Sequence, residues 1–270
     1  MKKVIWSCWL QGRQRAPWLV EKCLSSWERM NPEWEFRCLD QHSLHRFVDI
    51  PDIRNKRITR TSFSDITRIL LLKEYGGIWT DATTFCHRPL DEWLDASLVN
   101  GFFAFDRPGD DRMLASWFLA SAEHHYIVDR WCARTLAYWA ERTHAHTYFW
   151  FHHLFRGLFD ADAVFAAAWN GVPKISAVGP HAIQAVGMFQ TNQEAIFKGV
   201  DWRCPVFKLT HRIDQRQCVD GTLLARLLGP APLPDERVMT LDEGAPDSDH
   251  YPFAESCPFA PASELPPSTT

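Results

Sequence analysis

The sequence predicts an α/β protein with an open, mostly parallel sheet and helices on both of its faces. The first observation is the alternation of short apolar segments with amphipathic ones over the first 81 residues. This order is typical of parallel sheets, because each return to the same end of the sheet needs a crossover helix. The second observation is a helix, a tight turn and a strand that follow one another between residues 62 and 81. A length of 270 residues is enough to bury a large core.

The first elements follow from apolar periodicity and from proline positions. Val4 to Trp6 form an apolar run that predicts the first strand. Pro17 is well placed in the first turn of a helix, whose apolar face we expect to include Leu19, Val20, Cys23, Leu24 and Trp27. Asn31-Pro32 ends that helix. Residues 35–40 then predict a second strand, and residues 44–47 a short helix.

The stretch from 62 to 81 is the most informative part of the chain. Ser62 and Asp65 have the spacing of a capping box, so we expect a helix to begin at Ser62. Its apolar face would consist of Ile66, Ile69, Leu70 and Leu72. Gly76-Gly77 ends the helix, since glycine adopts a left-handed cap without steric cost. Ile78 to Thr80 then form a buried strand, which leaves Asp81 at or just past its carboxyl end.

The remaining elements are read in the same way. Apolar runs at 102–105 and 117–120 predict two strands that are separated by a polar loop at 106–112. A helix is expected over residues 126–140, and Asp160 is expected to cap another helix that extends through residue 168. Two later strands are predicted, at 174–178 and at 206–211.

The domain prediction follows from composition. Residues 1–228 form the α/β domain, and residues 229–270 form an extension rich in Pro, Asp, Glu and Ser. Because such a segment buries little apolar surface, we expect disorder from about residue 245.

A carboxylate at a strand end and an arginine on the preceding helix suggest a binding site. Asp65 and Arg68 are three residues apart, so they share one face of the helix. Ligands of open α/β sheets bind outside the carboxyl ends of the strands, where Asp81 is expected. A carboxylate there can hold sugar hydroxyls, a ribose or a divalent metal, and an arginine can bind phosphate with its planar fork. The alternatives are an aspartate that serves only the turn and a solvated ion pair.

Two segments together resemble the signature of a known enzyme class. Ser64-Asp65-Ile66-Thr67-Arg68 is followed by Tyr75-Gly76-Gly77-Ile78-Trp79-Thr80-Asp81-Ala82-Thr83. The pair resembles the Ser-Asp-x-x-Arg and Tyr-Gly-Gly-x-Tyr-x-Asp-x-Asp motifs of the sugar-region (D-x-D) glycosyltransferases. It is most similar to the capsular polysaccharide synthesis glycosyltransferases, in which Trp-x-Asp-Ala-Thr is usual. The resemblance implies a GT-A-like nucleotide-binding fold and transfer of a sugar from a nucleotide-sugar to a glycan acceptor, with retention of the anomeric configuration.

The resemblance also implies roles for individual residues. Asp81 and Arg68 would be the catalytic pair, and Asp65 would help Arg68 hold the donor sugar and its phosphates. Trp6 would stack on the base, and the alternative is that it is a core tryptophan of the first strand. The implied donor-binding set is Trp6, Asp65, Arg68, Trp79, Asp81, Thr83 and Lys208. Lys208 and His211 lie in a late Lys-Leu-Thr-His segment that resembles the end of the capsular family's domain.

One difference from the related motif affects the expected cofactor. Thr83 stands where the second carboxylate of the D-x-D motif would be, so this chain carries an Asp-x-Thr variant. A divalent cation, Mn²⁺ or Mg²⁺, is expected from the resemblance, with Asp81 and His211 as its ligands. A threonine hydroxyl is a weak metal ligand, so two outcomes stay open. Either the cation binds through Asp81, His211 and the diphosphate, or basic residues replace it.

Composition limits the partners. A net charge of −4 and the lack of basic clusters give no reason to expect nucleic-acid binding. No apolar run reaches 18 residues, and the apolar start ends at Gln11 without a cleavage site, so we expect a cytoplasmic protein, with the inner face of the membrane as an alternative. The aromatic run at 148–159 either packs in the core or covers a membrane surface or a lipid-linked acceptor. The competing functional hypothesis is a non-catalytic protein that binds nucleotide-sugars or glycans.

Overall fold

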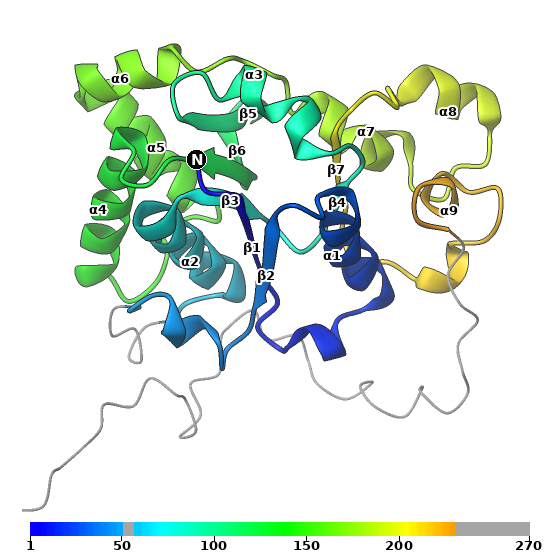
Figure 1. Cartoon of the computed structure of the whole chain (residues 1–270), viewed down its shortest axis with the longest axis horizontal. Coiled ribbons are helices and arrows are strands. Elements are labelled where there is room, and N and C mark those ends of the chain that lie inside the picture. Colours follow the sequence, from blue (N-terminus) through cyan, green and yellow to red (C-terminus); the bar gives the residue numbers. More distant parts are fainter. Residues whose placement is uncertain (51–56, 230–270) are drawn as a thin grey trace, which may run out of the picture.

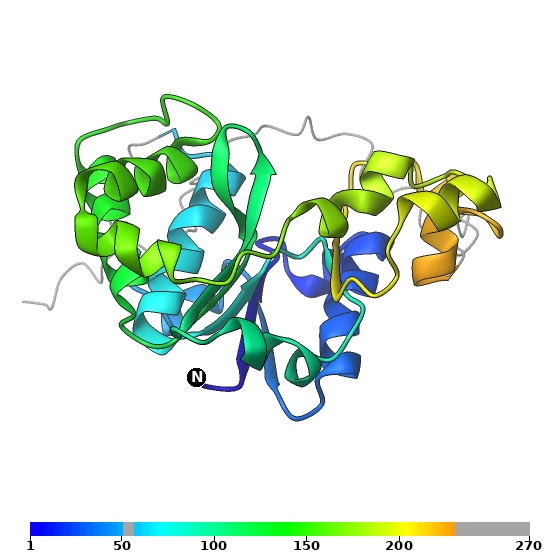
Figure 2. The same ribbon diagram turned by 90° about the horizontal axis from the view of Figure 1, so that it is seen from above.

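A computed structural model of the chain describes residues 1–50 and 57–229 (Figure 1). The predicted extension and its disorder from about residue 245 lie outside the described residues, apart from Gly229. The predicted α/β class is confirmed. A five-stranded sheet has the strand order β2-β1-β3-β6-β5, with helices on both faces (Figure 2).

Four of the five strands of this sheet run in the same direction. β1 (Val4–Cys8) pairs in parallel with β2 (Glu35–Leu39) and with β3 (Gly77–Thr80). β6 (Arg112–Ser121) is antiparallel both to β3 and to β5 (Phe102–Gly109). The carboxyl ends of β1 and β3 therefore lie at the same edge of the sheet.

Helices cover the two faces unequally. α1 (Trp18–Met30) lies on one face, where Trp27 stacks on Phe118 of β6. The other face carries α2 (Arg60–Tyr75), and α4 (Tyr126–Ala140) and α5 (Trp150–Ala161) pack beside it (Figure 2). The short helical elements are η1 (Arg13–Arg15), η2 (Leu44–Arg46), η3 (Leu90–Glu92), α3 (Leu94–Ser97), α6 (Ala163–Asn170), α8 (Gln193–Gly199) and η4 (Gln215–Gln217).

A second, two-stranded sheet stands beside the main one and contributes to the site described below. β4 (Thr84–Cys86) and β7 (Val206–Lys208) pair antiparallel, so that Thr84 lies opposite Lys208. A separate apolar cluster covers this sheet with α7 (Val178–Val186) and α9 (Leu223–Leu228). β4 was not predicted from the sequence, since it is only three residues long.

The turn between α2 and β3 requires both of its glycines. Gly76 has φ +62° and Gly77 has φ +88°, a region that favours glycine. A Cβ atom on Gly77 would lie 2.6 Å from the backbone oxygen of Val4 in the neighbouring strand. A Cβ atom on Gly76 would lie 2.7 Å from the backbone nitrogen of Glu123. These two close approaches fix the direction in which β3 leaves the helix.

The predicted start of α2 was wrong. The helix begins at Arg60, and its N-cap is Thr59, whose hydroxyl accepts a hydrogen bond from the backbone N–H of Ser62. Ser62 and Asp65 lie inside the helix, so their capping-box spacing has no capping role. Asp65 instead pairs with Arg68 one turn later.

Other element boundaries differ from the predictions as well. The expected loop at 106–112 is mostly strand, because β5 and β6 form one long hairpin with bulges. Asp162, not Asp160, caps α6, and Asp160 lies within α5. The predicted strand at 174–178 is reduced to one bridge between Ser176 and Asp106.

Most rings of the aromatic run at 148–159 are in the core. Trp150, Phe151 and Phe155 are buried, whereas Tyr148 is exposed. Core packing therefore accounts for most of this segment. Within the described residues, the structure has no helix that combines the length and the apolar character needed to cross a bilayer.

Candidate active site

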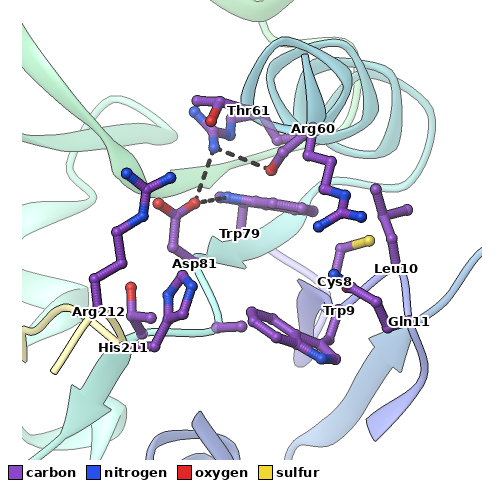
Figure 3. A pocket seen from close by; sticks show the side chains of 14 residues that line it. Cys8, Trp9, Leu10, Gln11, Arg60, Thr61, Trp79, Asp81, His211 and Arg212 are labelled. Carbon is purple, nitrogen blue, oxygen red and sulfur yellow. Dashed lines mark hydrogen bonds and ion pairs between the residues drawn. The ribbon is translucent and has the colours of Figure 1, made fainter. Parts of the chain in front are cut away.

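Four segments that are distant in sequence converge on one cavity. The cavity of about 220 Å³ lies at the carboxyl ends of β1 and β3, beside the first turns of α2 and the segment that follows β7 (Figure 3). Its lining residues are Cys8, Trp9, Leu10, Gln11, Arg60, Thr61, Ser64, Arg68, Trp79, Asp81, Ala82, Thr83, His211 and Arg212. This is the location at which open α/β sheets bind ligands.

Arg68 is the centre of the polar network. Its side chain is only 4% exposed, and it donates hydrogen bonds to Asp81 Oδ1 at 2.9 Å and to Ser116 Oγ at 2.8 Å. It also pairs with Asp65 and donates to Ser64 Oγ at 3.2 Å. The guanidinium is therefore held in one orientation by α2, β6 and the end of β3. A planar donor fixed in this way suits recognition of phosphate or carboxylate.

Asp65 contacts Arg68 but lies outside the lining of the cavity. It is 4% exposed and does not line the cavity. Burial raises the pKa of Asp65 to about 7, because desolvation outweighs the attraction of Arg68 and the negative charge of Asp81 adds to the effect. Asp65 thus acts on a ligand through Arg68 and is a positioning residue.

Asp81 is the carboxylate at the mouth of the site. Its Oδ1 accepts hydrogen bonds from Arg68 and, at 3.0 Å, from the indole N–H of Trp79. Its backbone N–H donates to the carbonyl of Trp117 at 2.9 Å, which fixes the turn after β3 to the neighbouring strand β6. The side chain remains 27% exposed. A carboxylate that is held on one oxygen and open on the other can accept hydrogen bonds from hydroxyl groups.

The β4–β7 pairing adds a second cation to this carboxylate. Lys208 Nζ donates a hydrogen bond to Thr83 Oγ1 and lies 3.9 Å from Asp81 Oδ2. The Leu209 N–H donates to the carbonyl of Thr83 at 2.8 Å, which continues the pairing beyond the strand. Burial lowers the pKa of the Lys208 ammonium, although Asp81 opposes this shift.

The structure brings together most of the predicted site residues. Arg68, Trp79, Asp81, Thr83 and His211 all line the cavity. Lys208 lies directly behind Thr83, and Asp65 lies behind Arg68.

Trp6 was wrongly assigned to base stacking. It is 2% exposed, and its ring packs against Phe47 and Tyr75, with the Arg37 guanidinium over it. Its indole N–H donates to the carbonyl of Gly76. Trp6 points into the core from the middle of β1, so no ligand can reach its faces in this conformation.

Trp9, which was not predicted as a site residue, lines the cavity together with Trp79. It follows the last residue of β1, and its ring meets the ring of His211 edge to face at a centroid distance of 5.4 Å (Figure 3). Its position just past a strand end could have identified it from sequence. Arg60 and Arg212 were also missed. Arg60 is two helical turns before Arg68, on the same face of α2, so helical periodicity could have found it, whereas Arg212 is placed by the fold of the segment after β7.

The side chains at Asp81 do not by themselves complete a divalent-cation site. A Mn²⁺ or Mg²⁺ ion requires several oxygen ligands. Among residues 1–50 and 57–229, Asp81 is the one carboxylate that lines the cavity, and one of its oxygens is bonded to Arg68 and Trp79. The hydroxyl of Thr83 is bonded to a lysine ammonium. Over the described part of the chain, no group of three or more His, Cys, Asp or Glu side chains could hold a metal ion.

Comparison with known sequences identifies the family. A family model described as capsular polysaccharide synthesis protein matches residues 1–227. The chain belongs to this family. The match covers all of the elements that form the site, from β1 to the segment that follows β7. The family predicted from the Ser-Asp-x-x-Arg and Trp-Thr-Asp-Ala-Thr segments is thereby confirmed.

Two curated relatives carry transferase names. The chain is 26% identical over 151 residues to the O-glycosyltransferase braB of Annulohypoxylon truncatum, a match that covers 48% of this chain and 36% of the relative. It is 27% identical over 163 residues to the O-glycosyltransferase PaGT of Phomopsis amygdali, a match that covers 53% of this chain and 40% of the relative. The chain thus spans less than half the length of these relatives.

A solved structure, the PaToxG glycosyltransferase, is also similar to the chain. The TM-score is 0.41 at 14% sequence identity, and the match covers 63% of this chain and 73% of the other.

Proposed function

We propose that this protein is a glycosyltransferase that moves a sugar from a nucleotide-sugar, with a UDP-sugar as the first candidate, to a glycan acceptor in capsular or other surface polysaccharide synthesis. The observation that carries the proposal is the position of Asp81. Its carboxylate is held by Arg68 and Trp79 at the strand-end cavity, with one oxygen facing Lys208. Family membership and the names of the two curated relatives support the same reaction class.

The reaction requires a site that binds both hydroxyls and a diphosphate. The bond between the anomeric carbon and the diphosphate oxygen breaks, and its electron pair leaves with the diphosphate. The acceptor hydroxyl oxygen forms the new bond to the anomeric carbon, and its proton passes to the departing diphosphate. Since negative charge grows on the leaving oxygen, fixed positive groups lower the barrier most when they already face that position. Arg68 supplies a fixed positive charge in the cavity lining, because four side-chain partners hold its guanidinium in place.

Each cavity residue has a role in this proposal. Asp81 accepts hydrogen bonds from hydroxyls of the donor sugar or ribose. Arg68 binds the diphosphate, and Trp79 orients Asp81 through its indole N–H. Trp9 offers an aromatic face at the cavity for the base, the role that sequence had given to Trp6.

The first experiment is nucleotide release from a panel of UDP-, GDP- and CMP-sugars, followed by NMR. Release from one donor identifies that donor, and the configuration of the product sugar tests the expected retention. Asp81→Asn keeps the shape of the side chain and removes its charge, so release should fall at least about 100-fold, as for loss of a charge-stabilising group. Asp201→Asn is the matched control, because Asp201 pairs with Arg203 on the surface, away from the cavity. The proposal is wrong if folded Asp81→Asn transfers sugar at the wild-type rate.

The competing function is a non-catalytic protein that binds nucleotide-sugars or glycans. Its supporting observation is Thr83, which replaces the second carboxylate of the related motif. Tight donor binding without turnover in the presence of a glycan acceptor pool would favour this alternative. Loss of donor binding in Asp81→Asn would then place the ligand in the same cavity.

The acceptor and the place of reaction form part of the same proposal. A glycan or a lipid-linked glycan would approach the open side of the cavity, and a lipid-linked acceptor would bring the protein to the cytoplasmic face of a membrane. Sedimentation with lipid vesicles that contain a polyprenyl phosphate would test this association.

A further inference from the structure

Lys208 contacts the residue that stands at the second acidic position of the resembled motif. Thr83 stands where the second acidic residue of the resembled motif stands, and its hydroxyl accepts a hydrogen bond from Lys208 Nζ. The same ammonium lies 3.9 Å from Asp81 Oδ2. A positive charge is therefore already present between the two positions of the Asp-x-Thr motif.

This arrangement is imposed by the fold. Thr83 immediately precedes β4, and Lys208 is the last residue of β7. The antiparallel register places Thr84 opposite Lys208 and brings together two segments that are 125 residues apart. Thr83 is 9% exposed and the Lys208 side chain 16% exposed, so the pair is not a solvated surface contact.

We propose that Lys208, together with Arg68, neutralises the donor diphosphate in place of a divalent cation, so that donor binding and cleavage by this protein are independent of metal. This inference rests on the proposed transferase function and concerns the charge that the site supplies. The lysine ammonium donates a hydrogen bond to a phosphate oxygen and keeps its proton. The glycosidic electron pair leaves with the diphosphate, as described above.

The charges around the site favour a diphosphate over a divalent cation. Two cations, Arg68 and Lys208, flank the carboxylate of Asp81, and Asp65 lies behind Arg68, outside the cavity lining. Arg60 and Arg212 line the same cavity. A metal ion at Asp81 would face the ammonium and the guanidinium at close range, which is repulsive, whereas a diphosphate is attracted by both. Lys208 lies behind Thr83 and also donates a hydrogen bond to the carbonyl of Leu209 at 3.2 Å, so in this proposal it reaches a phosphate oxygen by exchanging these two neutral partners.

The test measures nucleotide binding as well as turnover. Calorimetric titrations with UDP, GDP, ADP and CDP are run in EDTA and in MnCl₂, on the wild type and on Lys208→Met and Lys208→Arg. Lys174→Met is the matched control, because it also removes a half-buried lysine, one whose ammonium is bonded to backbone carbonyls outside the cavity. Circular dichroism and thermal denaturation establish that each variant is folded.

The expected result is a wild type that binds one nucleoside diphosphate with a dissociation constant that changes less than about threefold between EDTA and Mn²⁺. Lys208→Met should weaken this binding at least about tenfold, as expected for loss of one charged hydrogen bond. Lys208→Arg should restore most of it, and Lys174→Met should leave it unchanged. Donor cleavage should follow the same order in EDTA.

Two results would overturn the inference without affecting the proposed function. One is a wild type that binds a nucleoside diphosphate at least tenfold more tightly with Mn²⁺ than with EDTA. The other is a folded Lys208→Met variant that binds as the wild type does. If no nucleoside diphosphate binds in either condition and no donor is cleaved, the transferase proposal is wrong, and this inference falls with it.

Discussion

Replacement of Arg68 by methionine should destabilise the fold in a pH-dependent way. Methionine fills a similar volume but removes the cation that faces Asp65, Asp81 and Ser116. At pH 6 Asp65 is mainly protonated in the folded state, because its pKa is raised to about 7. The variant then loses mainly one charge-assisted hydrogen bond to Asp81, at a cost of about 1.5–3 kcal/mol.

At higher pH the cost should increase. In the wild type, Asp65 ionises near pH 7 with Arg68 beside it. Without Arg68 this carboxylate has lost its ion-pair partner in a buried site, and removal of one partner of a buried ion pair costs about 3–5 kcal/mol. The excess loss relative to the wild type should therefore grow between pH 6 and pH 9. Urea unfolding at both pH values measures the difference, with the double variant Asp65→Asn/Arg68→Met as control, in which the pH-dependent part should vanish.

Two outcomes would refute this reasoning. Equal destabilisation of Arg68→Met at pH 6 and pH 9 would show that Asp65 does not ionise against Arg68. A loss below about 1 kcal/mol at both values would show that the guanidinium contributes no net stability, as is found for exposed ion pairs.

Three further predictions concern the pH profile, the turn and the aromatic face of the site. Because the pKa of Asp65 rises from 3.8 to about 7 on folding, the stability of the wild type should fall by at most about 4 kcal/mol as pH rises between these values. In Asp65→Asn, the free energy of unfolding measured with urea should lose this dependence on pH. Gly77→Ala should lower the free energy of unfolding by more than about 3 kcal/mol, since the new Cβ would meet the Val4 backbone and the φ angle is positive. Gly157→Ala, in the middle of α5 with open space around it, should raise the free energy of unfolding by up to about 1 kcal/mol. Thermal or urea unfolding measures both variants, and equal changes in stability would contradict the argument. Trp9→Ala should weaken nucleotide binding about 5- to 150-fold, the range for loss of one stacked base. Trp18→Ala, which replaces a half-buried tryptophan outside the cavity, should leave the affinity unchanged. Calorimetry measures both variants, and equal nucleotide affinities of the two would rule out base stacking on Trp9.

The two tryptophans at the start of the chain show where sequence reasoning was insufficient. Both belong to the same apolar opening, and the resemblance pointed to Trp6. Strand geometry decides otherwise. Trp6 lies in the middle of β1 against Phe47 and Tyr75, whereas Trp9 lies past the end of the strand, where the chain leaves the sheet and meets the cavity. The predicted strand ended at Trp6, whereas β1 continues for two more residues to Cys8, and this difference changed the assignment.

Local sequence determined much of this protein. The apolar periodicity of residues 66–72 and the Gly76-Gly77 pair specify the helix and the turn, and these place Asp81 at a strand end. Asp65 and Arg68 were expected on one helix face because a separation of three residues places side chains together in any α-helix. These features depend on neighbours within a few positions, so they are readable without a fold.

Tertiary structure alone decided how the charges are arranged. The pairing of Lys208 with Thr83 requires the register of β4 with β7, and no local pattern encodes contact across 125 residues. Ser116 reaches Arg68 only because β6 lies beside β3. The raised pKa of Asp65 is likewise a consequence of burial by surrounding elements. Sequence placed a carboxylate and an arginine at a candidate ligand site. The packing of distant strands determined which other charges face them, since burial and long-range pairing depend on the whole fold.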